Sequence, residues 1–143
     1  MSDTREHVKA LLLDIKHDTQ RYDALRLLLQ QQRDAMIGCN TDTIQQVNAA
    51  LLPLYQQLAG SAQRRSDILQ TLRLANDSQG MAQLLRYLPV SLAQQVESWW
   101  RTLENNARAC QQLNERNGIL LTMQQETLES LTGEPSRTFL YTR

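Results

Sequence analysis

The stretch "SLAQQVESWWRTLENNARACQQLNERNGILL" (residues 91–121) decides the fold class. Its seam positions alternate steps of four and three residues, and they are Leu92, Val96, Trp99, Leu103, Asn106, Cys110, Leu113, Asn117 and Leu120. A mean step of 3.5 residues is typical of a helix that supercoils against a partner along its length. The spacing predicts a long helix that begins near Ser91, a candidate N-cap. It continues through Leu128 and Leu131, and Gly133 ends it.

Asn117-Gly118 lies inside this pattern, although an Asn-Gly pair is a strong turn signal between strands. Glycine also costs a helix about 1 kcal/mol relative to alanine. The apolar face nevertheless continues on both sides of the pair, so we predict an unbroken helix. We interpret Asn117 as a polar seam residue that fixes the register of helix packing, as buried asparagines do in coiled coils. Gly118 would then let another backbone approach closely, either from the same bundle or from a partner.

A first long helix is predicted from about Asp3 to Ile37. Its apolar positions lie three, four or seven residues apart on one stripe: Val8, Leu11, Leu12, Ile15, Tyr22, Leu25, Leu28, Leu29 and Met36. Gly38 suits the C-terminal cap of this helix, and Asn40 or Thr41 suits the N-cap of the next. A helix of this length is stable only if it packs against other helices along its whole length.

A second long helix follows Ile44, Val47, Leu51, Leu54, Leu58, Ala62, Ile68, Leu69 and Leu72. Pro53 falls inside it and either kinks the helix or opens a new one; the continuous stripe favours a kink. The loop "ANDSQG" (75–80) and a short helix at 81–88 come next. We therefore predict an all-α fold: an elongated antiparallel bundle or hairpin of three long helices plus one short helix. Residues 1–132 form one domain, and residues 133–143 form a flexible tail.

The composition excludes several classes of protein. Fifteen Lys and Arg balance fifteen Asp and Glu, so the formal net charge is zero and nucleic acid is not an expected partner. Arg64-Arg65 is interpreted as a solvated helix edge. The N-terminus has no signal-peptide core, no apolar run is long enough for a membrane span, and the two cysteines form no disulfide framework. The expected location is the cytoplasm.

No motif predicts catalysis, so we expect neither an enzyme nor a cofactor. Asp14 and His17 have the spacing of a bundle metal motif, but a second such motif is missing and no metal site is expected. Cys110 lies on the seam, where a thiol behaves as a small hydrophobe. Trp99 is predicted in the core, and Trp100 either covers a flank or belongs to a docking surface.

The block "LNERNGILLTMQQETLESLTG" (113–133), followed by "TFLY" (138–141), resembles the C-terminal signature of the FlgN family. The matching positions are Asn114, Asn117-Gly118, the apolar residues 119–121, and Tyr141. This resemblance implies a cytosolic type III export chaperone. Such a protein binds the C-terminal helical segment of flagellar hook-associated proteins, prevents their premature assembly and delivers them to the export gate.

The resemblance also implies two binding regions. The expected contacts with the exported protein are Leu113, Asn114, Asn117, Gly118, Leu120, Leu121, Met123 and Leu128. The expected docking motif for the export gate is Phe139, Leu140 and Tyr141. Met81 and Met123 either supply adaptable contacts in a groove or fill the core. The alternative function is a self-associating coiled-coil scaffold or adaptor, because the same seam suits a homodimer.

Overall fold

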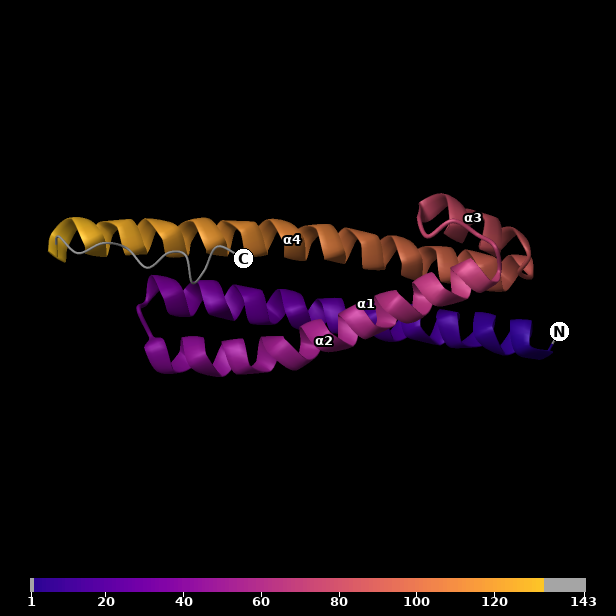
Figure 1. The fold of residues 1–143 in the computed structure, drawn as a ribbon, viewed down its shortest axis with the longest axis horizontal. Helices are drawn as coiled ribbons and strands as arrows, with labels where there is room; N and C mark the ends of the chain where they lie inside the picture. The colour runs from indigo at the N-terminus through magenta and orange to yellow at the C-terminus, as the bar shows by residue number, and fades with distance from the viewer. Residues whose placement is uncertain (1, 133–143) are drawn as a thin grey trace.

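The structure is a computed structural model that describes residues 2–132, so the predicted flexible tail lies outside the described residues. It contains α1 (Ser2–Ile37), α2 (Thr41–Thr71), α3 (Ser78–Arg86) and α4 (Val90–Thr132). Figure 1 shows an elongated array in which α3 lies across one end. The prediction of an all-α fold with three long helices and one short helix is confirmed.

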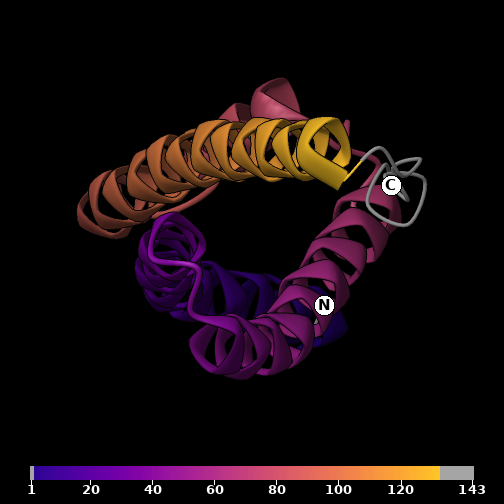
Figure 2. The same ribbon diagram turned by 90° about the vertical axis from the view of Figure 1, so that its left-hand side faces the viewer.

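Helix α1 is the central element of the array. It forms an antiparallel hairpin with α2 and runs parallel to α4, whereas α2 and α4 scarcely touch each other. Figure 2, which looks along the long axis, shows α2 and α4 on different sides of α1. The molecule is therefore an open three-helix array.

Two apolar clusters form the core. One, next to α3, includes Leu11, Ile15, Leu69, Met81 and Val96; the other, farther along α1, includes Leu25, Leu29, Val47, Leu58 and Cys110. The stripe predicted for α1 is therefore the face that it buries. The stripe predicted for α2 is wrong at one position: Ser61 is fully buried and Ala62 is exposed. Ser61 is polar, so a search for apolar residues passes over it.

The ends of α1 and α2 share one capping geometry. Cys39 and Arg73 both adopt left-handed backbone conformations, with φ of 54° and 60°. After each, a backbone N–H turns back to the helix: Asn40 N donates to Ala35 O at 2.9 Å, and Leu74 N donates to Leu69 O at 2.8 Å. These are Schellman caps. The left-handed position thus belongs to Cys39 rather than to Gly38.

At three positions, the structure either corrects a predicted helix boundary or decides between two predicted alternatives. Asn40 is the N-cap of α2, because its side chain accepts a hydrogen bond from Thr43 N. Helix α2 continues through Pro53 as one helix, so Pro53 opens no new helix; Figure 1 shows α2 bending along its length. Ser91 is not an N-cap, because α4 already begins at Val90 and Pro89 O accepts the first helical bond, from Ala93 N.

The residues predicted as loop 75–80 are partly helical. Asp77 caps α3 by accepting a hydrogen bond from Gly80 N at 2.9 Å, so the helix starts at Ser78 instead of residue 81. A Cβ atom on Gly80 would lie 1.7 Å from Ala75 O, so only glycine lets the loop pass this closely.

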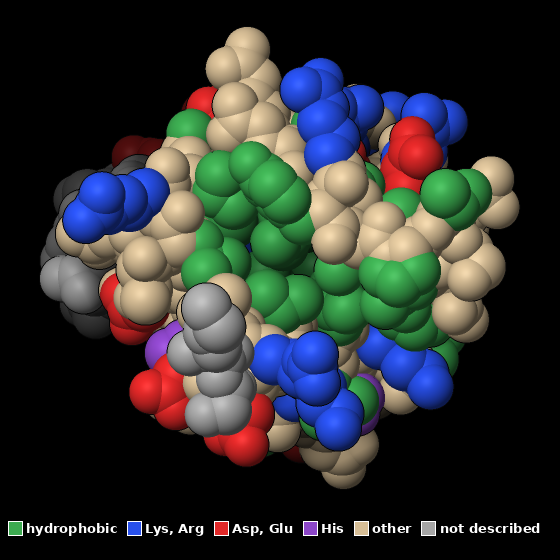
Figure 3. Space-filling view, turned by 90° about the vertical axis from the view of Figure 1, so that its right-hand side faces the viewer, with side chains coloured by type: hydrophobic (Ala, Val, Ile, Leu, Met, Phe, Trp, Pro, Cys, Tyr) green, Lys and Arg blue, Asp and Glu red, His purple; other side chains and the backbone are tan. Residues whose placement is uncertain are grey.

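Near α3, hydrophobic side chains gather on the end face (Figure 3), and Tyr87 is 82% exposed.

Candidate partner-binding groove

A groove separates α2 from α4, and α1 forms its floor. Its volume is about 350 Å³. Tyr22, Leu25 and Leu29 of α1 line the bottom. The walls are Tyr55, Leu58, Ala59 and Ala62 of α2, and Ala107, Cys110, Gln111 and Asn114 of α4. The groove exists because both outer helices pack on α1 along this stretch, whereas α2 and α4 meet elsewhere, at Arg65 and Trp100.

The groove carries no formal charge at neutral pH. Among the residues that the structure describes, its lining contains no Asp, Glu, Lys, Arg or His side chain. Burial raises the pKa of each of its three titratable groups, the Tyr22 and Tyr55 phenols and the Cys110 thiol, so all three stay neutral. Alanines on both walls leave room for another backbone. A neutral, partly apolar trough between helices suits an amphipathic helix.

The wall formed by α4 is held to α1 by a regular ladder of side-chain hydrogen bonds. Cys110 donates to Tyr22 O at 3.6 Å, Asn117 to Leu29 O at 2.9 Å, and Gln124 to Met36 O at 2.8 Å. Donors and acceptors each recur every seven residues. The two helices therefore pack in parallel with one constant register.

Asn117 also joins a chain of amides across all three long helices. Its Nδ2 donates to Gln32 Oε1 at 3.0 Å, and Gln32 Nε2 donates to Asn48 Oδ1 at 2.8 Å. Asn117 is only 3% exposed, and its Oδ1 has no hydrogen-bond partner within residues 2–132. An orphaned buried acceptor costs free energy, so the amide favours this register more than it adds stability.

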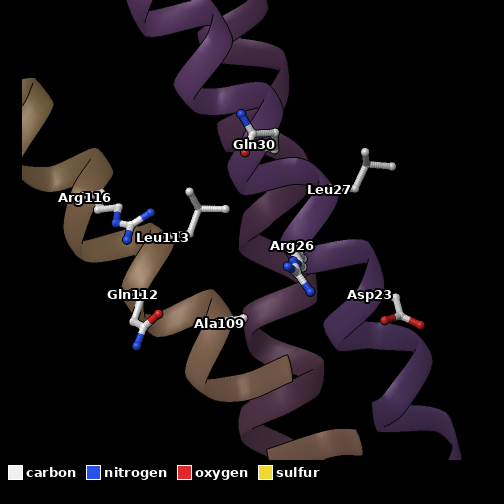
Figure 4. A pocket seen from close by; sticks show the side chains of 8 residues that line it. All are labelled: Asp23, Arg26, Leu27, Gln30, Ala109, Gln112, Leu113 and Arg116. Carbon is white, nitrogen blue, oxygen red and sulfur yellow. The ribbon is translucent and has the colours of Figure 1, made fainter. Parts of the chain in front are cut away.

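The eight residues predicted to contact an exported protein do not share one face. Asn114 lines the groove, and Gly118 follows one turn later on the same side of α4. Leu113 instead lines a second pocket on the opposite flank of the α1–α4 seam (Figure 4). The spacing places Leu121 and Leu128 toward the groove side and Leu120 and Met123 toward the opposite flank. Asn117 lies between these two sets, in the seam.

Gly118 is exposed, and a Cβ atom there would meet no atom of residues 2–132 within 4 Å. Among the described residues, the prediction of a close backbone approach within the same bundle is therefore wrong. An approach by a partner stays a prediction. The methionine alternatives separate clearly: Met81 is 1% exposed and fills the core, whereas Met123 is 57% exposed.

The last turns of α4 extend past the turn between α1 and α2 (Figure 1). Leu128 and Leu131 are 61% and 80% exposed there. The three residues of the predicted gate motif, Phe139, Leu140 and Tyr141, lie outside the described residues. The structure therefore leaves α4 with an apolar end that α1 and α2 do not cover.

The sequence analysis missed one buried polar cluster, centred on Asp18. Asp18 is 2% exposed and accepts hydrogen bonds from Ser61 Oγ at 2.5 Å and Arg21 Nη1 at 2.9 Å. Arg65 Nη1 lies 3.7 Å from its second oxygen. Asp18 lies three residues after Ile15 and four before Tyr22, which is a position on the buried face of α1. The sequence would have indicated its burial if polar residues had been included in the search for seam positions.

The two adjacent arginines and the two adjacent tryptophans pack near this cluster. Arg64 is exposed and pairs with Asp14 at 2.8 Å, so its interpretation as a solvated edge is confirmed. Arg65 is largely buried and lies 5.2 Å from the ring centroid of Trp100, so that interpretation is wrong for Arg65. Trp99 and Trp100 both pack against the cluster next to α3. A free docking surface at Trp100 is therefore not observed.

Across residues 2–132, no three His, Cys, Asp or Glu side chains form a group able to hold a metal ion. None of the four helices in the same range combines the length and hydropathy needed to cross a bilayer.

Comparison with known proteins identifies the family. The model of the FlgN protein family matches residues 1–142. The crystal structure of a Pseudomonas aeruginosa protein named for flagella synthesis, FlgN, superposes with a TM-score of 0.73 at 26% identity, covering 78% of this chain and 86% of that one. No protein with a curated functional description matches the sequence significantly. Because the family model spans nearly the whole sequence, this chain belongs to the FlgN family.

Proposed function

We propose that this protein is a flagellar export chaperone that binds the C-terminal helical segment of hook-associated proteins. The observation that carries the proposal is the uncharged groove between α2 and α4, floored by Tyr22, Leu25 and Leu29. An amphipathic helix laid in this groove would complete a four-helix bundle and bury its apolar face. Family membership and the flagella-synthesis relative support the same role.

The chemistry of the groove explains how binding would prevent premature assembly. A terminal segment that is unfolded when free exposes an apolar helix face that can self-associate. The groove offers that face alanine, leucine and tyrosine side chains, while the amides of Gln111 and Asn114 meet its polar edge. Ordering a free segment costs conformational entropy, so the complex is expected to be reversible. Reversibility is what delivery to an export gate requires.

Delivery is the second half of the proposal. The resemblance assigns the gate contact to Phe139, Leu140 and Tyr141, which follow α4 in the sequence. Replacing Phe139 and Tyr141 by alanine is expected to leave the complex with the exported segment intact and to impair its export. If the complex itself were lost, the motif would belong to the groove instead.

The binding proposal is tested by co-expressing this chain with the C-terminal segment of a hook-associated protein. Size-exclusion chromatography with light scattering should show one peak with the mass of a one-to-one complex. Separate elution of the two proteins at micromolar concentration would contradict the proposal. A stable homodimer that ignores the segment would instead favour the scaffold alternative.

A further inference from the structure

The flank of the α1–α4 seam opposite the groove carries a different chemistry. A pocket of about 460 Å³ lies there, between α1 and α4. Figure 4 shows Arg26 of α1 and Leu113 and Arg116 of α4 around the same opening. In contrast to the groove, this pocket is lined by charged side chains. The molecule therefore presents two unlike binding faces on the two sides of one helix pair.

The arginines on this flank form no ion pair within the described part of the chain. Arg26 and Arg116 are exposed, and no ion pair joins either to a side chain of residues 2–132. Arg33 lies seven residues after Arg26, on the same face of α1, and its Nη1 is buried without a hydrogen-bond partner inside the described part of the chain. Three guanidinium groups thus follow one edge of the seam.

The carboxylates nearby are already engaged by amides. Asp23, the pocket's one acidic side chain, accepts a hydrogen bond from Asn106 Nδ2 at 2.9 Å. Asp34, farther along α1, accepts one from Gln30 Nε2 at 3.1 Å. These bonds leave the charge on both carboxylates, so three arginines stand against two aspartates and the flank keeps a small positive excess.

The flank also exposes apolar surface beside the arginines. Leu27 is 61% exposed, and Leu113 is half-buried at the pocket. Nucleic acid would use a broader basic surface with few aliphatic side chains. Guanidinium groups next to leucines instead match a peptide helix that carries carboxylates along one edge and aliphatic side chains on its face.

We propose that this flank is a second protein-binding surface, and that its partner is an acidic amphipathic segment of another protein. Carboxylates of the partner pair with Arg26, Arg33 and Arg116, and its aliphatic side chains cover Leu27 and Leu113. The surface is independent of the α2–α4 groove, so both partners can be bound at once. The inference does not rest on the proposed chaperone function.

A designed helical peptide with leucines on one face and glutamates along its edges serves as the probe. A twin peptide with lysine at every glutamate position is the matched control. Methyl NMR spectra of the full chain should shift at Leu27 and Leu113 with the acidic peptide and stay unchanged with its twin. The affinity should fall as salt is added, since exposed charge pairs are screened.

Charge reversal then tests the arginines. The double variant Arg26→Glu, Arg116→Glu should weaken acidic-peptide binding by about tenfold or more, the effect of losing about 1.4 kcal/mol. Arg5→Glu, an exposed reversal on α1 roughly 30 Å from Arg26 at 1.5 Å per residue, should change it by less than about twofold. Both variants should still co-elute with the hook-associated segment.

Equal binding of the two peptides, or equal affinity of the double variant and wild type, would overturn the inference. Shifts confined to the methyl groups of Ala59 and Ala62 would overturn it as well, because they would place the acidic helix in the groove. Failure of the hook-associated segment to bind would leave these results unaffected.

Discussion

The side-chain amide of Asn117 on α4 donates a 2.9 Å hydrogen bond to the backbone carbonyl of Leu29 on α1. Cys110 and Gln124 repeat this arrangement one heptad before and one heptad after it. The parallel register of α1 and α4 is thereby specified by polar groups at positions where a simple coiled coil carries leucine. This register sets the position of the groove wall relative to its floor.

Replacing Asn117 by alanine should lower the free energy of unfolding by about 1–3 kcal/mol, since two hydrogen bonds of about 1 kcal/mol each are lost. Asn114→Ala, on the exposed surface of the same helix, should change it by about 0.5 kcal/mol or less. Urea unfolding followed by circular dichroism measures both. Equal effects at the two positions would show that the buried amide contributes nothing to stability.

Two glycines should respond oppositely to alanine. Gly118→Ala places a methyl group where no atom of residues 2–132 lies within 4 Å, and should stabilise α4 by up to about 1 kcal/mol. Gly80→Ala drives a Cβ atom into Ala75 O and should destabilise the fold by about 1–3 kcal/mol. Thermal unfolding compares the two variants. If Gly118→Ala weakened binding of the hook-associated segment while raising stability, it would support a partner backbone close to Gly118.

The spacing of the apolar residues was sufficient to predict the long helices. A long helix can bury one continuous face only if its apolar residues recur about every 3.5 residues. The same spacing was also sufficient to predict a continuous helix at Asn117-Gly118, against the local turn signal. Cap positions were less predictable, since Cys39 and Arg73 adopt left-handed conformations that their residue types do not favour. Tertiary context, not local preference, selects them.

Asp18 should be among the most sensitive polar positions. Asp18→Ala removes the partner of Ser61 and Arg21 and leaves the largely buried Arg65 without its nearest carboxylate. We expect a loss of about 2–4 kcal/mol, because breaking a buried charge pair leaves an uncompensated charge.

Glu97→Ala is the matched control for Asp18→Ala. It removes an exposed ion pair with Arg101 and should cost about 0.5 kcal/mol or less. Chemical unfolding of both variants gives the difference directly. A smaller loss at Asp18 than at Glu97 would refute the role assigned to the buried cluster.

Stability should fall at alkaline pH because the groove lining must stay neutral. Burial raises the pKa of Cys110, Tyr22 and Tyr55 in the folded chain, so the unfolded chain loses these protons first. Stability contributed by these groups is complete below about pH 8.5 and is lost as the pH rises through the folded pKa values.

The variant Cys110→Ala isolates the thiol in this pH series. Its loss of stability should begin nearer pH 10, about where unperturbed tyrosines ionise. Urea unfolding between neutral pH and this range measures both proteins. A decline that starts at the same pH with and without the thiol would contradict a neutral, buried Cys110.

The candidate site was only partly predictable from the sequence. The signature block located the correct helix, yet it placed Leu113, Asn117 and Gly118 in one binding set. A linear motif on a helix points in every direction, so its residues divide among the groove, the seam and the opposite flank. The contributions of α1 and α2, such as Tyr22 and Ala59, depend on tertiary packing and carry no local signal.

The most direct measurement of the central claim is the affinity of the hook-associated C-terminal segment for two arginine variants of α2. Ala62→Arg places a long charged side chain in the groove, whereas Ala49→Arg makes the same change at an exposed position outside it. Arginine is a good helix former, so both variants should fold. We predict that Ala62→Arg weakens binding by about tenfold or more, while Ala49→Arg binds like the wild type. Equal affinity of the two variants would contradict the assignment of the α2–α4 groove as the chaperone's binding site.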